Sequence, residues 1–385
     1  MAWFPNWLGV SFDHSTGRGP CQFLAGKPWR RACTVSGSAG PAPWFSPPWD
    51  KSGGTTWRIR IAFPRIALHI FAYSYMHWAP AHAETATRKR EYPMTHAPEV
   101  TGFYEARTGS VQYVVADPAT KNCAIIDPVL DYDEKSGATA TIEADRILNF
   151  VAGRGYAVQW ILDTHPHADH FSAADYLKRK TGAPTAIGEK VVEVQKLWKE
   201  FYNWPDFPAD GSQWDRLFAE GETFRVGDIP ARVMFSPGHT LASISYVIGD
   251  AAFVHDTLFM PDSGTARADF PGGDAHVLWR SIQAILALPD ETRVFTGHDY
   301  CQGGREPRWE STVAEQKAHN IHMAQYRSEA EFVAAREARD RTLPMPKLIL
   351  HALQVNTNAG RLPEPESNGR RYLKIPLDLL QAPWD

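Results

Sequence analysis

The spacing of apolar and polar residues divides the chain into two parts of different character. Residues 1–95 contain clustered Trp, Pro, Gly and Arg, most densely at residues 41–49, with no sustained period of 2 or 3.6. Such a segment cannot easily bury a core, so we predict a low-order N-terminal extension. The regular pattern that follows predicts a folded domain over residues 96–300. We expect residues 301–385 to form a helical extension and tail that complete the same domain.

Short apolar runs bounded by turn residues predict strands through the second part of the chain. The predicted strands are residues 111–115, 123–127, 157–163, 224–226, 231–235, 244–248 and 251–254. Residues 143–152 have an amphipathic helical pattern, and Ser172 with Asp175 forms a capping-box-like start to a helix reaching about residue 180. Because the strands come in pairs with helices between them, the pattern predicts an α/β fold, a sandwich of two sheets flanked by helices.

The pattern becomes helical after residue 300. Two capping boxes predict helix starts there, namely Thr312 with Glu315 and Ser328 with Glu331. Pro344 lies where the second of these helices is expected to end. The tail beyond it is punctuated by prolines and contains one predicted strand, residues 372–375.

The composition narrows the class of protein. A hydrophobic content of 43% and a charged content of 22% are those of a soluble globular protein. The net charge of −4 gives no general attraction to nucleic acid or anionic membrane, and no apolar run reaches the roughly 18 residues of a spanning helix. The four cysteines (Cys21, Cys33, Cys123 and Cys301) are far apart, which argues against a disulfide framework or a zinc ribbon. Such cysteine usage suits a reducing compartment and predicts a cytoplasmic protein.

A histidine-rich loop is the strongest chemical signal in the chain. His165, His167, Asp169 and His170 form an H-x-H-x-D-H pattern between the predicted strand 157–163 and the helix that follows. Loops at the end of a sheet are where α/β folds place their sites. A single histidine in such a loop would be an ordinary polar residue, but this pattern favours a metal-binding site.

Four further residues extend this pattern, each at the end of a predicted strand: Asp127, His239, Asp256 and His298. Asp127 is expected to orient a ligand imidazole without touching the metal. Each of these residues alone is a weak signal, because polar residues at strand ends are usually solvated. Their order after the histidine loop is what makes them informative.

That order resembles the metallo-β-lactamase fold superfamily over roughly residues 100–300. The resemblance implies a four-layer αββα sandwich with a metal site at one edge. Carried over by position, one potential metal site would use His165, His167 and His239, the other would use Asp169, His170 and His298, and Asp256 would lie between them.

The segment after Asp256 resembles that of persulfide dioxygenases, in a form like that of a bacterial branch of sulfur-detoxifying relatives. It carries an Arg-x-Asp-Phe core at residues 267–270, whereas glyoxalase II enzymes usually have an aromatic-Glu-Gly segment here. Three details differ from the mitochondrial type of dioxygenase. His255 replaces a usual glycine, Thr265 stands where a cysteine is common, and the chain after Tyr300 is longer.

This resemblance implies one Fe(II) per chain, bound by His165, His239 and Asp256. A single iron with two histidines and one carboxylate keeps positions open for oxygen chemistry. The implied substrates are glutathione persulfide and dioxygen, with no nucleic-acid or membrane partner; a homo-oligomer is left open. Remaining groups would orient ligands or relay protons: Asp127, His167, Asp169 (as a catalytic residue), His170 and His298.

Arg267 is the predicted substrate-binding and catalytic cation, which would pair with a substrate carboxylate or the sulfur anion. The alternative for this residue is a local ion pair with Asp269 or Asp262. The alternative for the whole protein is a thioester hydrolase of glyoxalase II type with two Zn(II) ions per chain. Two metals about 3.5–4 Å apart would share a bridging hydroxide suited to hydrolysis.

Overall fold

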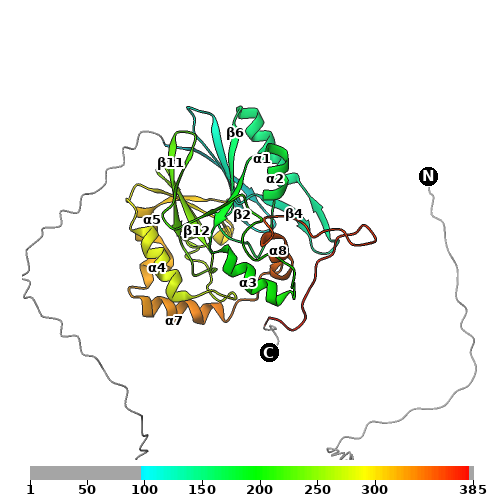
Figure 1. Ribbon diagram of the computed structural model, residues 1–385. Coiled ribbons are helices and arrows are strands. Elements are labelled where there is room, and N and C mark those ends of the chain that lie inside the picture. The colour runs from blue at the N-terminus through cyan, green and yellow to red at the C-terminus, as the bar shows by residue number, and fades with distance from the viewer. Residues whose placement is uncertain (1–96, 381–385) are drawn as a thin grey trace, which may run out of the picture. The chain divides into compact units, whose positions relative to one another are not determined.

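Two six-stranded sheets face each other in the structure, a computed structural model that describes residues 97–380 (Figure 1). The predicted N-terminal extension, residues 1–95, lies outside the described residues. The first sheet has the order β1-β2-β3-β6-β8-β9 and the second the order β10-β11-β12-β13-β14-β15. A small third sheet has the order β5-β4-β7.

The strands are short. In the first sheet they are β1 (Glu99–Glu105), β2 (Ser110–Ala116), β3 (Asn122–Ile126), β6 (Ala157–Leu162), β8 (Thr185–Gly188) and β9 (Arg216–Phe218). In the second they are β10 (Thr223–Val226), β11 (Ile229–Phe235), β12 (Ile244–Ile248), β13 (Ala251–His255), β14 (Arg293–Thr296) and β15 (Glu310–Thr312). The small sheet consists of β4 (Val129–Asp133), β5 (Ala138–Ala140) and β7 (Phe171–Ser172).

Strand β3 shows why the central strands are apolar throughout. Cys123 and Ile125 point to a core between the first sheet and its covering helices. Ala124 and Ile126 point the other way, into the core between the two sheets. Because successive side chains of a strand alternate between the faces of its sheet, a strand buried on both faces needs apolar residues at every position.

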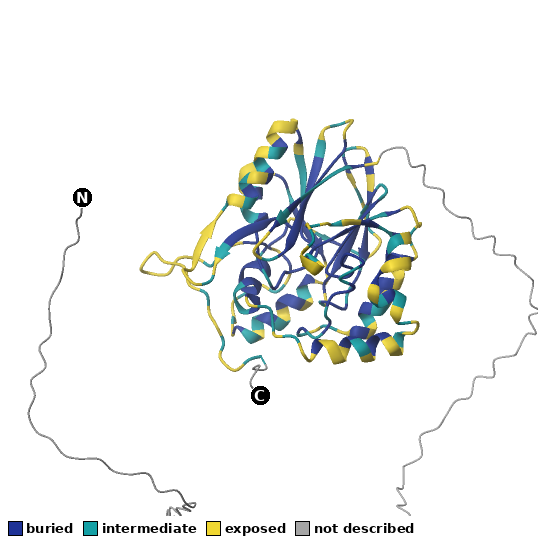
Figure 2. Cartoon of the chain, turned by 180° about the vertical axis from the view of Figure 1, so that it is seen from behind, coloured by how far each residue is buried: buried dark blue, intermediate teal, exposed yellow. Residues whose placement is uncertain are grey.

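Helices cover the outer face of each sheet. Those packed against the core of the first sheet are α1 (Ile142–Arg154), α2 (Ala174–Thr181) and α8 (Ile349–Asn356). Those on the second sheet are α4 (Ala275–Leu286), α5 (Val313–His319), α6 (Ile321–Gln325) and α7 (Glu329–Asp340). α3 (Val191–Phe201) shares a smaller core with α8, and η1 (Gln302–Gly304) is a single short turn. Figure 2 shows the exposed positions on the outer faces of the helices and the buried positions on the strands between them.

The α/β fold class and the four-layer αββα sandwich are therefore confirmed. At both predicted helix starts after residue 300, the hydroxyl of the expected cap residue forms its bond. The Thr312 hydroxyl accepts the Glu315 N–H at 3.1 Å, and the Ser328 hydroxyl accepts the Glu331 N–H at 3.3 Å. None of the helices in residues 97–380 combines the length and apolar character that crossing a bilayer requires.

Two local predictions were wrong. Ser172 is not the N-cap residue of α2, because the helix begins at Ala174 and Ala173 precedes it. The Ser172 hydroxyl accepts the Ala174 N–H at 3.1 Å and donates to the buried Asp163 carboxylate at 3.0 Å. Residues 372–375 form no strand, because their backbone has no neighbouring strand to pair with. The Lys374 N–H instead donates to the side-chain oxygen of Gln354 at 2.7 Å. Gln354 belongs to α8, a helix that the sequence pattern did not predict.

Candidate metal centre

The predicted site residues come together at one edge of the two sheets. The loop with His165, His167, Asp169 and His170 follows β6, and Asp127 follows β3, which is parallel to β6. His239, Asp256 and His298 follow β11, β13 and β14 in the second sheet. Since β13 and β14 are also parallel, their carboxyl ends bring Asp256 and His298 to the same edge.

His165, His239 and Asp256 form a compact group, called here the metal triad. One ligand atom from each lies within 4.8 Å of the others. Asp256 Oδ2 is 3.8 Å from His165 Nε2 and 3.5 Å from His239 Nε2. All three side chains are buried. Two imidazoles and a carboxylate at this spacing are suited to bind one metal ion.

The Nδ1 atom of each triad histidine already makes a hydrogen bond within the protein. His165 Nδ1 lies 3.0 Å from the Thr164 hydroxyl, which in turn donates to Asp127 at 2.9 Å. His239 Nδ1 donates to the backbone carbonyl of Arg267 at 2.9 Å. A hydrogen bond at Nδ1 fixes the tautomer that leaves the Nε2 lone pair free. The His165 Nε2 atom is buried and has no hydrogen-bond partner among the described residues, as expected of a metal ligand.

The electrostatics of the triad also favour a metal ion. Burial, together with the neighbouring His167, holds the pKa of His165 well below its usual value, so its ring is neutral and able to bind metal. Burial by itself would raise the pKa of Asp256, but His298 and His239 hold that pKa well below its usual range. The triad therefore presents a neutral imidazole at His165 and a charged carboxylate at Asp256.

His298 lies between two carboxylates. Its Nδ1 is 2.6 Å from Asp256 Oδ1, and its Nε2 is 2.7 Å from Asp169 Oδ2. Although burial opposes a charge on this ring, the two carboxylates raise the pKa of His298 well above its usual value. Both ring N–H groups then donate, so two of the three residues expected at the second metal site, Asp169 and His298, are engaged with each other, and His298 also donates to Asp256.

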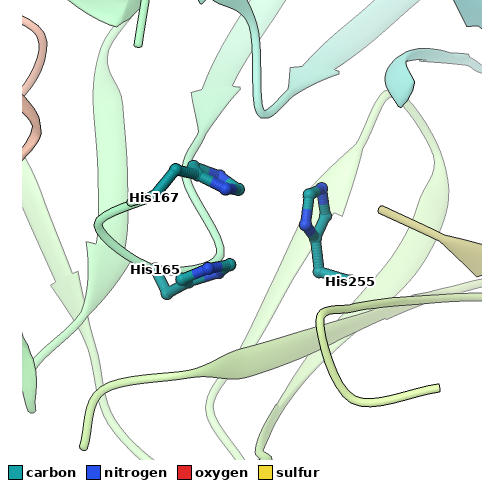
Figure 3. A group of neighbouring side chains, drawn as sticks. All are labelled: His165, His167 and His255. Carbon is teal, nitrogen blue, oxygen red and sulfur yellow. The ribbon is translucent and has the colours of Figure 1, made fainter. Parts of the chain in front are cut away.

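Asp127 lies against two histidines. His167 Nε2 is 3.0 Å from Asp127 Oδ1, and His255 Nε2 contacts Asp127 Oδ2. His255 was not predicted as a site residue, yet it forms a second close group with His165 and His167, and the three rings face a common space (Figure 3). The available signal was its departure from the usual glycine at this position. A third close group consists of His167, Asp169 and His170.

A cavity of about 1010 Å³ opens onto the metal triad. Its inner wall includes Asp169, His239, Asp256 and His298, and its outer wall includes Tyr132, Arg267, His322, Arg339 and Lys347. Part of the wall is formed by the segments after residue 300, which the resemblance to known enzymes did not cover. A small organic substrate with anionic groups would fit this volume and these walls.

Arg267 forms the local ion pair that was the alternative to a substrate role. Its Nε and Nη2 donate to the two carboxylate oxygens of Asp269 at 2.6 and 2.7 Å. Its Nη1 donates to the carbonyl of Pro344 at 2.7 Å, and the guanidinium lies 4.9 Å from the ring centre of Phe270. Asp262, the other candidate partner, pairs with Arg305 instead.

Comparison with known proteins agrees with the fold and this geometry. Residues 107–298 match the model of the metallo-beta-lactamase superfamily, and the chain belongs to that superfamily. It is 71% identical over 288 residues to a beta-lactamase hydrolase-like protein of Xylella fastidiosa, covering 74% of this chain and 67% of that protein. It is 44% identical to glyoxylase B2 of Dictyostelium discoideum, covering 75% of this chain and 100% of the relative. The crystal structure of ETHE1 from Myxococcus xanthus has a TM-score of 0.55 and 31% identity, covering 68% of this chain and 100% of that one.

Proposed function

We propose that the chain is a mononuclear iron persulfide dioxygenase. The reaction takes glutathione persulfide, dioxygen and water to glutathione and sulfite, with release of two protons. The observation that carries the proposal is the metal triad, in which two free Nε2 atoms and one carboxylate surround a single position. Similarity to ETHE1 and to glyoxylase B2 is compatible with both an oxygenase and a hydrolase, so the choice rests on the site.

The triad residues would hold the metal. Iron(II) bound there would supply adjacent open positions at which a persulfide sulfur and dioxygen meet. The Nδ1 hydrogen bonds of His165 and His239 keep both rings aimed at one place, which preserves the geometry through turnover.

Asp169 and His298 are the groups we assign to proton transfer. Asp169 is 28% exposed, lines the cavity and accepts a hydrogen bond from His298. His298 in turn donates to the triad carboxylate Asp256. This chain of hydrogen bonds connects the metal position to the cavity, along which the protons released by the reaction can leave.

Arg267 is the group we assign to the substrate anion. A guanidinium has five N–H donors. Three are directed at Asp269 and Pro344, and a fourth makes only a long contact of 3.5 Å with the Leu343 carbonyl. At least one donor is therefore available to a carboxylate or sulfur anion in the cavity. The Asp269 pair would hold the guanidinium plane in place for that contact.

A dinuclear thioester hydrolase with two Zn(II) ions is the second candidate. The observation in its favour is the close group of His167, Asp169 and His170, because these residues could bind a second metal ion beside the triad. In that function the metals would bind a bridging hydroxide, and glutathione would be released without oxygen uptake. The cytoplasmic location stays a prediction for either function.

The test compares metal content with two activities. The full chain is prepared under low oxygen, its metals are counted by elemental analysis, and samples loaded with Fe(II) or Zn(II) are assayed. We expect near one iron per chain, and oxygen uptake with glutathione persulfide that follows the iron content. Asp256→Asn should lose iron and oxygen uptake together, because a neutral amide is a poor metal ligand. Two zinc ions per chain, with thioester hydrolysis that follows zinc, would establish the hydrolase instead.

A further inference from the structure

Helix α7 carries a pair of opposite charges on its buried face. Arg336 and Asp340 lie about one turn apart and are 6% and 2% exposed. The Arg336 Nε donates to Asp340 Oδ1 at 2.9 Å, and the two side chains form an ion pair. Apolar residues of similar volume often stabilise a protein as well as a buried ion pair does. What distinguishes this pair from an apolar contact is the set of hydrogen bonds that it makes with another part of the chain.

The ion pair of α7 holds the backbone of residues 265–268. Arg336 Nη1 donates to the carbonyl of Thr265 at 3.2 Å, and Asp340 Oδ2 accepts the N–H of Ala268 at 2.8 Å. Both hydrogen bonds are buried. Residues 265–268 form no regular strand or helix, so their backbone groups depend on side chains for partners. The pair thus fixes both ends of this short segment.

The backbone carbonyl of Arg267, inside this segment, orients a metal ligand. His239 Nδ1 donates to this carbonyl at 2.9 Å, and the Nε2 side of the ring belongs to the metal triad. The hydrogen bond at the second nitrogen fixes the tautomer and the orientation of a metal-binding imidazole. Because the carbonyl lies between the two bonds made by Arg336 and Asp340, its position depends on α7. The position of the His239 ring depends on α7 in turn.

We propose that Arg336 and Asp340 are positioning residues that set the affinity of the metal triad for its ion. They act through residues 265–268 and His239, and they do not bind the metal themselves. The inference rests on the proposed function in one respect, namely that the triad is the metal position. α7 lies outside residues 107–298, which match the superfamily model, so the helices that follow the matched region contribute to the metal centre.

The test separates positioning from stability with a double variant. Arg336→Met together with Asp340→Val replaces both charges with apolar side chains of comparable size, so α7 should stay folded. Thr265 and Ala268 lose their hydrogen bonds, and the zinc affinity of the full chain should fall about 10- to 100-fold, as is usual when a group that orients a metal ligand is lost. Zn(II) is titrated into metal-free protein against a competing chelator, with folding followed by circular dichroism.

Val333→Ala is the matched control for a general loosening of α7. Val333 is buried in the core of the second sheet and its helices, where α7 packs on α4 (Figure 1). Its side chain makes no hydrogen bond to residues 265–268. The variant should therefore unfold at a lower temperature than the wild type and still bind zinc with the wild-type affinity.

Two single variants test the hydrogen bond to Ala268 by itself. Asp340→Ala and Asp340→Asn both leave Arg336 without its carboxylate partner, but the amide oxygen of asparagine can still accept the Ala268 N–H. Zinc affinity should fall further in Asp340→Ala than in Asp340→Asn. This comparison keeps the inference testable if the double variant does not fold.

The outcomes separate this inference from the proposed function. Wild-type zinc affinity in the folded double variant, an equal loss in Val333→Ala, or equal losses in Asp340→Ala and Asp340→Asn would each overturn the inference. The proposed function depends instead on the metal count and the reaction of the wild type. Two zinc ions per chain with thioester hydrolysis would overturn that function and leave the inference standing, because the triad residues bind metal in both functions.

Discussion

The Asn356 side chain, at the end of α8, donates hydrogen bonds of 2.7 Å to the backbone carbonyls of both His167 and His170. Its Oδ1 accepts the N–H of Ser172 at 2.7 Å, so one amide holds three points of the histidine loop. The amide is buried, and 189 residues separate Asn356 from His167. The last helix of the chain thus fixes the loop that carries most of the candidate ligands.

Replacing Asn356 should therefore weaken both the fold and the site. Asn356→Ala leaves two carbonyls and one N–H buried without partners, which is expected to lower the free energy of unfolding by about 2–4 kcal/mol. Zinc affinity should fall as the loop relaxes. Denaturant unfolding and zinc titration of the full chain measure both effects. The matched control is Asn358→Ala, which removes only a 3.4 Å contact to the Arg361 carbonyl, and equal effects of the two variants would contradict the assignment.

Gly238 should tolerate no side chain, because it positions the triad residue His239. Its φ is +125°, and a Cβ there would lie 2.3 Å from the backbone nitrogen of Leu278 in α4. Gly238→Ala is expected to destabilise the protein by more than about 1–3 kcal/mol and to reduce metal content, since helix and loop must move apart. The control is Gly153→Ala in α1, where an added Cβ meets nothing within 4 Å. Thermal unfolding of Gly153→Ala at or above the wild-type temperature, beside a clear loss in Gly238→Ala, would agree with this account.

Arg267→Ala should impair the handling of a persulfide while iron stays bound. A charge-assisted hydrogen bond is worth about 1.5–3 kcal/mol, so kcat/KM should fall by roughly 10- to 150-fold. Arg267→Lys should recover only part of this loss, because an ammonium cannot reproduce the planar fork. Oxygen uptake is measured beside iron content for both variants. If Arg267 serves only its pair with Asp269, the alanine variant will instead lose iron and stability together, and Asp269→Ala will match it.

His322 should make the protein less stable in mild acid. Burial, together with Arg336 and Arg339, lowers the pKa of His322 to about 4, and its Nδ1 accepts the N–H of Thr265 at 3.0 Å. The unfolded chain takes up this proton near the ordinary pKa of about 6.5, before the folded chain does. Stability is therefore complete above pH 6.5 and declines as the pH falls towards 4. Unfolding free energies at pH 7 and pH 5 should differ less in His322→Gln than in the wild type; an identical difference would refute the assignment.

Local sequence patterns determined much of the fold and much of the candidate site. Residues 123–126 of β3 are apolar at successive positions because both faces of the first sheet are covered. The hydroxyls of Thr312 and Ser328 start helices through contacts three residues apart. The order of the histidine and aspartate motifs resembles that of the metallo-β-lactamase superfamily, and this resemblance predicted which loops meet. The strand and cap signals are short-range, so they can be read from the chain.

The tertiary structure determined which side chains contact the loops of the candidate site. Only packing brings Asn356 beneath the histidine loop, places the His255 ring against Asp127 and directs most donors of Arg267 to Asp269 and Pro344. The spacing of apolar residues in α8 did not predict these contacts. The pattern of residues 372–375 predicted a strand, but no neighbouring strand pairs with these residues. Such contacts join residues far apart in sequence, and their energies depend on burial and distance rather than on periodicity.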